Sequence, residues 1–250
     1  MKKRLDKSQI ERFSRQLILK NIGAKGQKKI LSSKILIVGV GGLGCPAAES
    51  LVRAGIGTIG LIDDDIVNLS NIHRQSLFNS KDIKKPKVNV AAKKLKEINP
   101  QTKIKTYKSR LDKNNIQNII KNYELIIDGS DNFKTKFLIN DYCIKYKKKL
   151  ITGAISKFDG HIFSFDFKDK KTASLKSFYQ EKEISDDILS CEFDGVLGTI
   201  ASIVGATQAN EALKMIMEIG QNLKNQILII DLLNLNFRKV KFKKRSDKIR

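Results

Sequence analysis

Residues 34–44 read KILIVGVGGLG, and this stretch decides the fold. Residues 34–40 form a continuous apolar run that ends in glycines, as is typical of a buried strand in a parallel sheet. The pattern G-x-G-x-x-G follows at Gly39, Gly41 and Gly44, and a helix is expected over residues 44–54. Such a turn brings N–H groups at a helix N-terminus close to a phosphate. The stretch predicts a nucleotide site in a Rossmann-like α/β fold; the alternative is a glycine turn needed only for tight packing.

Expected strands and helices alternate on both sides of this stretch. The strands are expected at residues 57–62, 102–107, 124–127 and 150–154. The helices are expected at residues 9–20, at 44–54 with Gly55 as C-cap, from Pro86 to residue 98, at 114–121 and at 132–146, with a loop over 66–80. Alternation at this spacing indicates a doubly wound, mostly parallel sheet.

The pattern changes after residue 155. Residues 161–167 read HIFSFDF, and their apolar–polar alternation predicts an antiparallel strand. A crossover loop is expected at 169–194, a long helix at 196–219, closing antiparallel strands at 227–231 and 236–242, and a basic tail at 243–250. We interpret residues 1–250 as a single domain, with a nucleotide-binding half at about 30–155 and an antiparallel half at about 156–242.

The chain is strongly basic, with 48 Lys and Arg against 26 Asp and Glu and a formal net charge of +22. Only nine of the basic residues are Arg, and the chain has five Tyr and no Trp. Nucleic-acid sites usually rely on Arg forks and stacking aromatic rings. The charge is therefore interpreted as a solvated Lys-rich surface that can also steer an acidic partner, and a nucleic-acid footprint is the less favoured reading.

The three cysteines are Cys45, Cys143 and Cys191, and no C-x-x-C pair is present. Disulfide scaffolding is not expected in the cytoplasm, where we place this protein. The longest tempting uncharged stretch, 195–210, contains Thr, Ser and Gln and is too short to span a membrane. The basic N-terminus is not followed by the apolar region of a signal peptide.

Several chemistry-bearing residues follow predicted strands. Asp63 ends the second strand, where it can bond a ribose hydroxyl. Because the carboxyl ends of parallel strands converge on one crevice, six residues are expected to face one ligand: Gly41, Asp63, Asn71, Arg74, Lys87 and Asp131. Two cations, carboxylates and an amide around a nucleotide suit a triphosphate with Mg²⁺.

Each of these residues has a simpler explanation. Arg74 could pair with Asp64 or Asp65 at the surface, and Lys87 could be one more solvated lysine. Asp131 could cap the helix that follows it. Taken together, in this order and spacing, the simpler explanations lose weight.

The motifs then resemble a known family. They are the segments RFSRQ at 12–16, GVGGLG at 39–44, DDD at 63–65, SNIHRQ at 70–75, Lys87, and SDN at 130–132. This set is similar to the ThiF/MoeB/HesA family of ubiquitin-activating-type adenylyltransferases, closest to the molybdopterin-synthase sulfurylase branch. The resemblance extends from about residue 8 to residue 242.

The resemblance implies an ATP-dependent adenylyltransferase that acts as a homodimer. Its substrate would be the C-terminal Gly-Gly carboxylate of a ubiquitin-like sulfur-carrier protein, held by the antiparallel half. Asp131 would hold Mg²⁺, Arg15 would reach the ATP of the other subunit, and Cys191 would be able to link covalently to the carrier. The implied nucleotide-binding residues are Gly39, Gly41, Gly42, Gly44, Asp63, Asp65, Asn71, Arg74, Gln75, Lys87, Asp131 and Asn132. The sulfur donor is not implied.

Three points stay open at this stage. Relatives commonly carry two C-x-x-C pairs for zinc, whereas the matching segments here read KTASL at 171–175 and KKRSD at 243–247, so no zinc is expected. Cys191 could be an inert thiol. The alternative functions are a sulfur-carrier adenylyltransferase of thiamine biosynthesis, a tRNA threonylcarbamoyladenosine dehydratase and, from another class, an NAD-dependent dehydrogenase.

Overall fold

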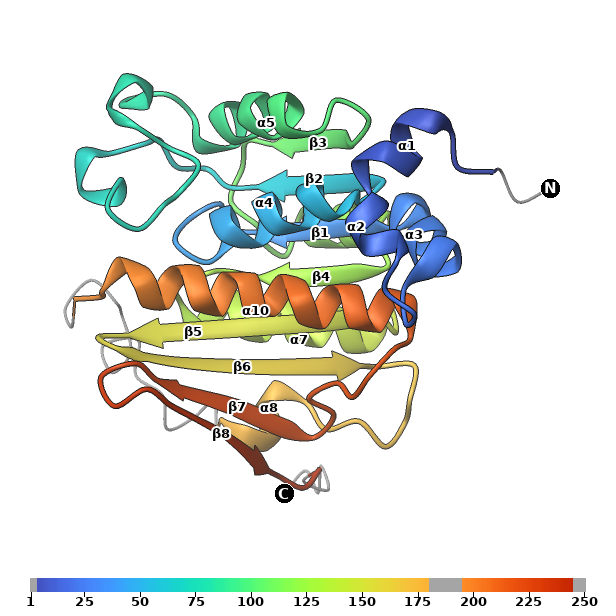
Figure 1. Ribbon diagram of the computed structural model, residues 1–250. Helices are drawn as coiled ribbons and strands as arrows, with labels where there is room; N and C mark the ends of the chain where they lie inside the picture. Colours follow the sequence, from blue (N-terminus) through green and yellow to red (C-terminus); the bar gives the residue numbers. More distant parts are fainter. Residues whose placement is uncertain (1–3, 180–194, 245–250) are drawn as a thin grey trace.

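The computed structural model describes residues 4–179 and 195–244, and within them one eight-stranded sheet forms the centre of the molecule (Figure 1). The strand order is β3-β2-β1-β4-β5-β6-β7-β8. The strands are β1 Lys34–Val38, β2 Thr58–Ile62, β3 Lys103–Tyr107, β4 Leu125–Asp128, β5 Lys149–Ser156, β6 Asp159–Asp166, β7 Gln226–Asp231 and β8 Asn236–Lys241. The first five strands pair in parallel, and β6, β7 and β8 add antiparallel pairs. The predicted fold class is confirmed.

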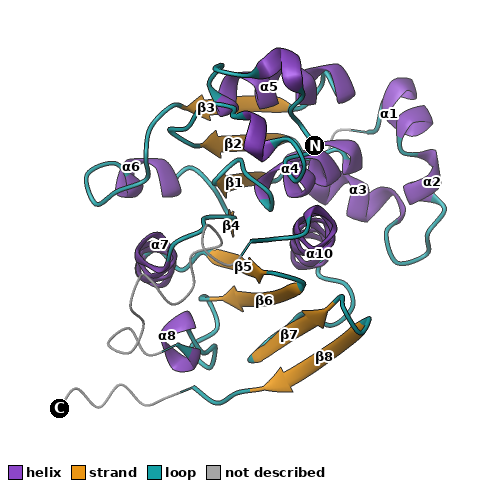
Figure 2. Ribbon diagram, turned by 90° about the vertical axis from the view of Figure 1, so that its left-hand side faces the viewer, coloured by secondary structure: helices purple, strands orange, loops and turns teal. Residues whose placement is uncertain are grey.

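Helices cover both faces of the sheet (Figure 2). One face carries α4 Gly44–Ala54, α5 Lys87–Ile98 and α10 Gly198–Met217, and the other carries α6 Ile116–Ile120, α7 Phe133–Lys145 and α8 Leu175–Phe178. Alternate residues of β1 enter two separate apolar cores: Ile35 and Ile37 on one face, Leu36 and Val38 on the other. A strand buried on both faces needs the unbroken apolar run that the sequence has.

The strand order creates a switch point between β1 and β4. From β1 the chain builds outward through β2 and β3, and it then returns to place β4 on the other side of β1. In open parallel sheets a ligand crevice opens at such a point, beyond the carboxyl ends of the strands. The loops after β1 and β4 therefore face each other: a Cβ added to Gly39 would lie 2.9 Å from the carbonyl oxygen of Gly129.

The N-terminal region differs from the prediction. The single helix expected over 9–20 is broken at Phe13 into α1 Lys7–Arg12 and α2 Ser14–Leu17, and a further helix, α3 Gly23–Ser32, was not predicted. The physical reason is burial of Phe13, whose side chain turns inward against the end of α4. Its ring lies so close to Gly55 that a Cβ there would sit 2.4 Å from Cζ. Gly55, at φ +93°, is the predicted left-handed C-cap of α4.

Other boundaries shift by a few residues, because pairing extends or trims the elements. The strand β5 is longer than expected because it pairs with β6 along its whole length, beyond the residues that pair with β4. The loop expected over 66–80 contains a short 3-10 turn at Leu69–Asn71 and reaches a second one, Ser80–Asp82. The expected basic tail lies outside the described residues from residue 245 onward.

The start of the expected crossover loop is tied to the residues just before β7. Asn225 accepts a hydrogen bond from the N–H of Ala173 at 2.8 Å and donates one to the carbonyl of Lys171 at 3.3 Å. Lys224 pairs with Asp169 beside them. These contacts hold residues 169–173 to the segment that leads into β7.

No helix in the described ranges combines the length and apolarity that crossing a membrane requires.

Candidate active site

A cavity of about 700 Å³ opens beyond the carboxyl ends of β1, β2 and β4, at the switch point. Its walls come from the loops that follow these strands, from the N-terminus of α5 and from β5 and β6. Most residues that the sequence predicts for the site line it: Gly39, Gly41, Gly42, Asp63, Asp65, Asn71, Arg74, Gln75, Lys87, Asp131 and Asn132.

The glycines of the first loop serve two different purposes. Gly39 adopts φ +83°, and a Cβ on Gly44 would lie 1.9 Å from the carbonyl oxygen of Gly39, so the turn itself requires both. Gly41 differs, because a Cβ there would meet only the Gln75 amide nitrogen within 4 Å among the described residues, at 3.6 Å. Packing of the chain does not require glycine at this position. A bare backbone facing a cavity fits a group that approaches from outside the chain.

Gln75 lies directly under this loop. Its side chain is 3% exposed, and its Oε1 atom has no hydrogen-bond partner among the described residues. A buried amide oxygen without a partner is costly. The Oε1 atom is shielded from solvent, whereas the Nε2 atom is the one nearest the position that a Cβ on Gly41 would take.

Asp63 links the glycine loop to the turn after β2. Its Oδ2 accepts the N–H of Val40 at 2.6 Å, and its Oδ1 accepts the N–H of Asp65 at 2.8 Å. Burial raises the pKa of Asp63, while these two N–H groups and the positive charge of Lys87 act in the opposite direction. The carboxylate is thereby fixed in place at the edge of the cavity, in the position predicted from the strand end.

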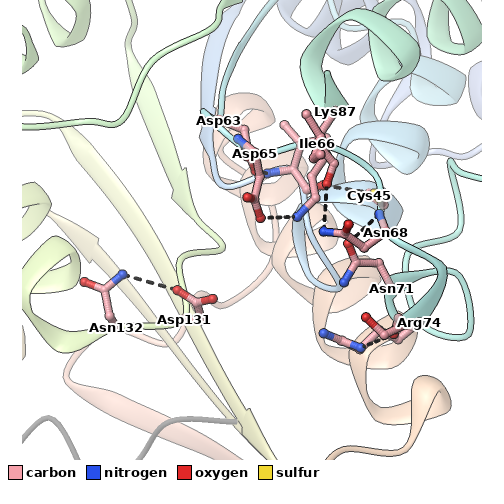
Figure 3. A network of polar contacts seen from close by, with 12 residues as sticks. Cys45, Asp63, Asp65, Ile66, Asn68, Asn71, Arg74, Lys87, Asp131 and Asn132 are labelled. Atoms are coloured by element: carbon pink, nitrogen blue, oxygen red, sulfur yellow. Dashed lines mark hydrogen bonds and ion pairs between the residues drawn. The ribbon is translucent and has the colours of Figure 1, made fainter. Parts of the chain in front are cut away.

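Lys87 is not a solvated lysine. It follows Pro86 as the first residue of α5, and only 5% of it is exposed. Its Nζ lies 2.8 Å from Oδ2 of Asp65, and its N–H donates to the Asp65 carbonyl at 3.0 Å (Figure 3). The pair holds a positive charge at the cavity wall.

Arg74 does not form the surface ion pair that was the simpler reading. Its Nη1 donates to the carbonyl of Ser70 at 2.9 Å and lies 2.8 Å from Nε2 of His73. In the described part of the chain no carboxylate pairs with Arg74, and Asp65 is taken by Lys87. Asn71 closes the preceding turn by accepting the N–H of Asn68 at 3.2 Å.

Asp131 lies across the cavity from these residues (Figure 3). The next helix is capped by Asn132, whose Oδ1 accepts the N–H of Thr135 at 2.9 Å, so capping does not explain Asp131. The Asp131 carboxylate is exposed and accepts one hydrogen bond, from the Asn132 side chain at 3.2 Å. The described residues contain no cluster of three or more His, Cys, Asp or Glu side chains arranged for a metal. A single carboxylate still fits Mg²⁺ when phosphate oxygens and waters supply the other ligands.

Two predicted residues do not line the cavity, and a third is not among the described residues. Gly44 does not line the cavity and is explained by the tight turn. Arg15 lies on α2, which Figure 1 shows beside the amino ends of β1 and β2, whereas the cavity lies beyond the carboxyl ends of these strands, so within one chain the two are not brought together. Cys191 lies outside the described residues.

The two cysteines that the structure describes lie in the core of the protein. Cys45 and Cys143 are fully buried. Burial raises the pKa of Cys45 to about 12 and also raises the pKa of Cys143. Neither thiol is a nucleophile at neutral pH.

The cavity also contains residues that the sequence analysis missed. Lys136 lines it while only 4% exposed, and in a lysine-rich chain nothing in the sequence distinguishes this lysine from the solvated ones. His161 lies 3.3 Å from the Tyr179 hydroxyl, and burial lowers its pKa, so the imidazole is neutral at pH 7. The sequence signal that could have identified His161 is its position as the one histidine in the alternating segment 161–167.

The chain was compared with known proteins. The sequence profile of the ThiF family matches residues 13–250. A "Probable molybdopterin-synthase adenylyltransferase" of Gracilaria tenuistipitata var. liui is 38% identical over 237 residues, which cover 95% of this chain and 66% of that protein. A "Sulfur carrier protein adenylyltransferase" of Thermus thermophilus is 36% identical over 240 residues, covering 95% of this chain and 89% of that protein.

A solved structure agrees with the fold. The crystal structure of E. coli MccB with ATP superposes with a TM-score of 0.83 at 21% identity, covering 94% of this chain and 72% of that chain. The likeness at this identity concerns the fold alone. The profile match over nearly the whole chain and the Thermus relative together show that the chain belongs to the ThiF family.

Proposed function

We propose that this protein is an ATP-dependent adenylyltransferase that activates the C-terminal glycine carboxylate of a ubiquitin-like sulfur-carrier protein for thiocarboxylate formation. The observation that carries the proposal is the cavity at the switch point. The bare backbone of Gly41 lines it together with Lys87 and Arg74, and Asp131 lies across from these two cations. The names of the Gracilaria and Thermus relatives support this activity, and the former supports a place in molybdopterin biosynthesis.

The reaction is attack of a carboxylate oxygen on the α-phosphorus of ATP, with pyrophosphate as the leaving group. Both substrates are anions, so the site must neutralise charge before they can approach. In the proposal, Lys87 and Arg74 supply positive charge beside the phosphates, and Asn71 and Gln75 offer amide groups. Asp63 accepts hydrogen bonds from the ribose. Asp65 keeps Lys87 oriented, because their ion pair is already formed in the protein.

Asp131 is the residue proposed to hold Mg²⁺. The ion, when bound, neutralises phosphate charge and orients the triphosphate. Asn132 donates to the Asp131 carboxylate and caps α7, so the loop that carries the metal ligand is tied to a helix.

Two further parts of the proposal rest on Arg15 and Cys191. Because α2, which carries Arg15, lies at the amino ends of the strands and the cavity lies beyond their carboxyl ends, a contribution of Arg15 to catalysis requires the cavity of a second subunit. We therefore propose a homodimer with Arg15 acting in trans. Cys191 is proposed as a residue that links covalently to the carrier. The antiparallel half of the chain is proposed to bind the carrier, and the protein is proposed to act in the cytoplasm.

The central activity is tested by ATP–pyrophosphate exchange. Purified protein with MgATP and a sulfur carrier that ends in Gly-Gly should incorporate labelled pyrophosphate into ATP. A carrier lacking the last glycine is the control and should give no exchange, because the carboxylate no longer reaches the α-phosphorus. Absence of exchange with every co-encoded carrier would overturn the proposed function.

The two roles of glycine in the phosphate loop predict opposite effects of alanine. Gly41→Ala should fold normally and weaken ATP binding by roughly tenfold or more, because its methyl group occupies space that a phosphate needs. Gly44→Ala should lower the free energy of unfolding by about 2 kcal/mol or more, because its Cβ overlaps a backbone oxygen. Thermal unfolding and ATP titration of both variants check this pair. Wild-type ATP affinity in Gly41→Ala would contradict the assignment.

Mixing two inactive variants tests the trans role of Arg15. Arg15→Ala and Asp131→Ala should each be folded and inactive in pyrophosphate exchange. Refolded together in equal amounts, they should regain about a quarter of wild-type activity, because half of the dimers are mixed and each of these has one complete site. If Arg15 acts within its own chain, the mixture stays inactive.

A further inference from the structure

A buried ion pair lies beneath the loop that carries Asp131. Asp128, the last residue of β4, is fully buried, and Lys136 on α7 is 4% exposed. The Lys136 Nζ lies 3.1 Å from Oδ2 of Asp128. Removing two charges from water is expensive unless their remaining hydrogen-bonding capacity is satisfied.

The other hydrogen bonds of Asp128 and Lys136 join neighbouring helices and strands. Lys136 also donates to the carbonyl of Gly153 on β5 at 2.6 Å, and the Thr152 hydroxyl donates to Oδ2 of Asp128 at 2.5 Å. The Asp128 carbonyl accepts the side chain of Gln208 on α10 at 2.9 Å. The Asp128 carboxylate thus connects β4 with α7 and β5, and the Asp128 carbonyl connects β4 with α10 on the opposite face of the sheet.

The second carboxylate oxygen of Asp128 shapes the loop itself. Its Oδ1 accepts both the N–H of Ser130, at 2.9 Å, and the Ser130 hydroxyl, at 2.6 Å. Gly129 donates to the carbonyl of Val38 at 2.8 Å, beside the glycine loop. Residues 129 and 130 are held from both sides, and Asp131 is the next residue along the chain.

We propose that Asp128 and Lys136 are positioning residues that set where the Asp131 carboxylate lies relative to the phosphate loop, and thereby set the Mg²⁺ affinity of the nucleotide complex. This inference rests on the proposed function, because it takes Asp131 as the Mg²⁺ ligand. Residues that orient a metal ligand typically change metal affinity by about ten- to a hundredfold when they are removed.

The test measures binding of a non-hydrolysable ATP analogue by calorimetry, in EDTA and over a range of MgCl₂ concentrations. Lys136→Met should raise the MgCl₂ concentration for half-maximal enhancement about tenfold and leave the affinity in EDTA within about twofold of wild type. Lys136→Arg should restore most of the Mg²⁺ response, since its guanidinium can still pair with Asp128.

A matched control separates positioning from general loss of stability. Glu211 on α10 is also buried, at 4% exposure, and bonds Ser164 and the N–H of Leu223, but it does not line the cavity. Glu211→Gln should lower the unfolding temperature and leave the Mg²⁺ response unchanged. Should Lys136→Met fail to fold, the double variant Asp128→Asn with Lys136→Met leaves no unpaired buried charge, and it should show the same shift in Mg²⁺ response.

The outcomes are distinct. A wild-type Mg²⁺ response in Lys136→Met or in the double variant, or an equal loss of affinity in EDTA, overturns the positioning role. If the wild-type protein itself binds the analogue no better with MgCl₂ than in EDTA, the proposed role of Asp131 fails, and this inference fails with it.

Discussion

The structure depends on the close approach of two turns at the switch point of the sheet. The turn after β1 meets the turn after β4 so tightly that a Cβ on Gly39 would lie 2.9 Å from the Gly129 carbonyl oxygen, and a Cβ on Gly129 would lie 3.2 Å from the Gly44 nitrogen. This contact fixes the N-terminus of α4 and the loop after β4 on opposite sides of one crevice. Lys87 and Arg74 therefore lie across the cavity from the Asp131 carboxylate, at a distance that backbone contacts set. Backbone contacts set such a distance more firmly than flexible side chains do.

The charges at the site are arranged before any ligand arrives. Lys87 is buried but paired with Asp65, Asp63 is held by two backbone N–H groups, and Asp128 is matched by Lys136. Such arrangement lowers the reorganisation needed when two anions must be brought together. Lys87 and Lys136 are buried and paired with carboxylates, and in this they differ from the many lysines that give the chain its net charge of +22. Most of that charge lies outside the cavity, as the sequence analysis expected.

Structural features that depend on a few neighbouring residues could be predicted from the sequence. The apolar run of β1, the glycine turn, the strand-end aspartate and the helix start at Pro86 each have a short-range physical cause, and the structure confirms their positions. Features that depend on distant partners were missed. The break at Phe13 arises from its packing against Gly55, and the burial of Lys136 arises from Asp128, Thr152 and Gly153 on other elements. No pattern within either segment encodes those neighbours.

The central claim is that a nucleotide binds at the switch point, with its triphosphate against Gly41 and its metal at Asp131. A crystal structure of the protein with a non-hydrolysable ATP analogue and Mg²⁺ tests it most directly. We expect phosphate oxygens in contact with the Gly41 backbone, Lys87 and Arg74, a ribose hydroxyl on Asp63, and Mg²⁺ coordinated by Asp131. Phosphates bound away from the glycine loop, or a metal ion without Asp131 among its ligands or hydrogen-bonded neighbours, would contradict it.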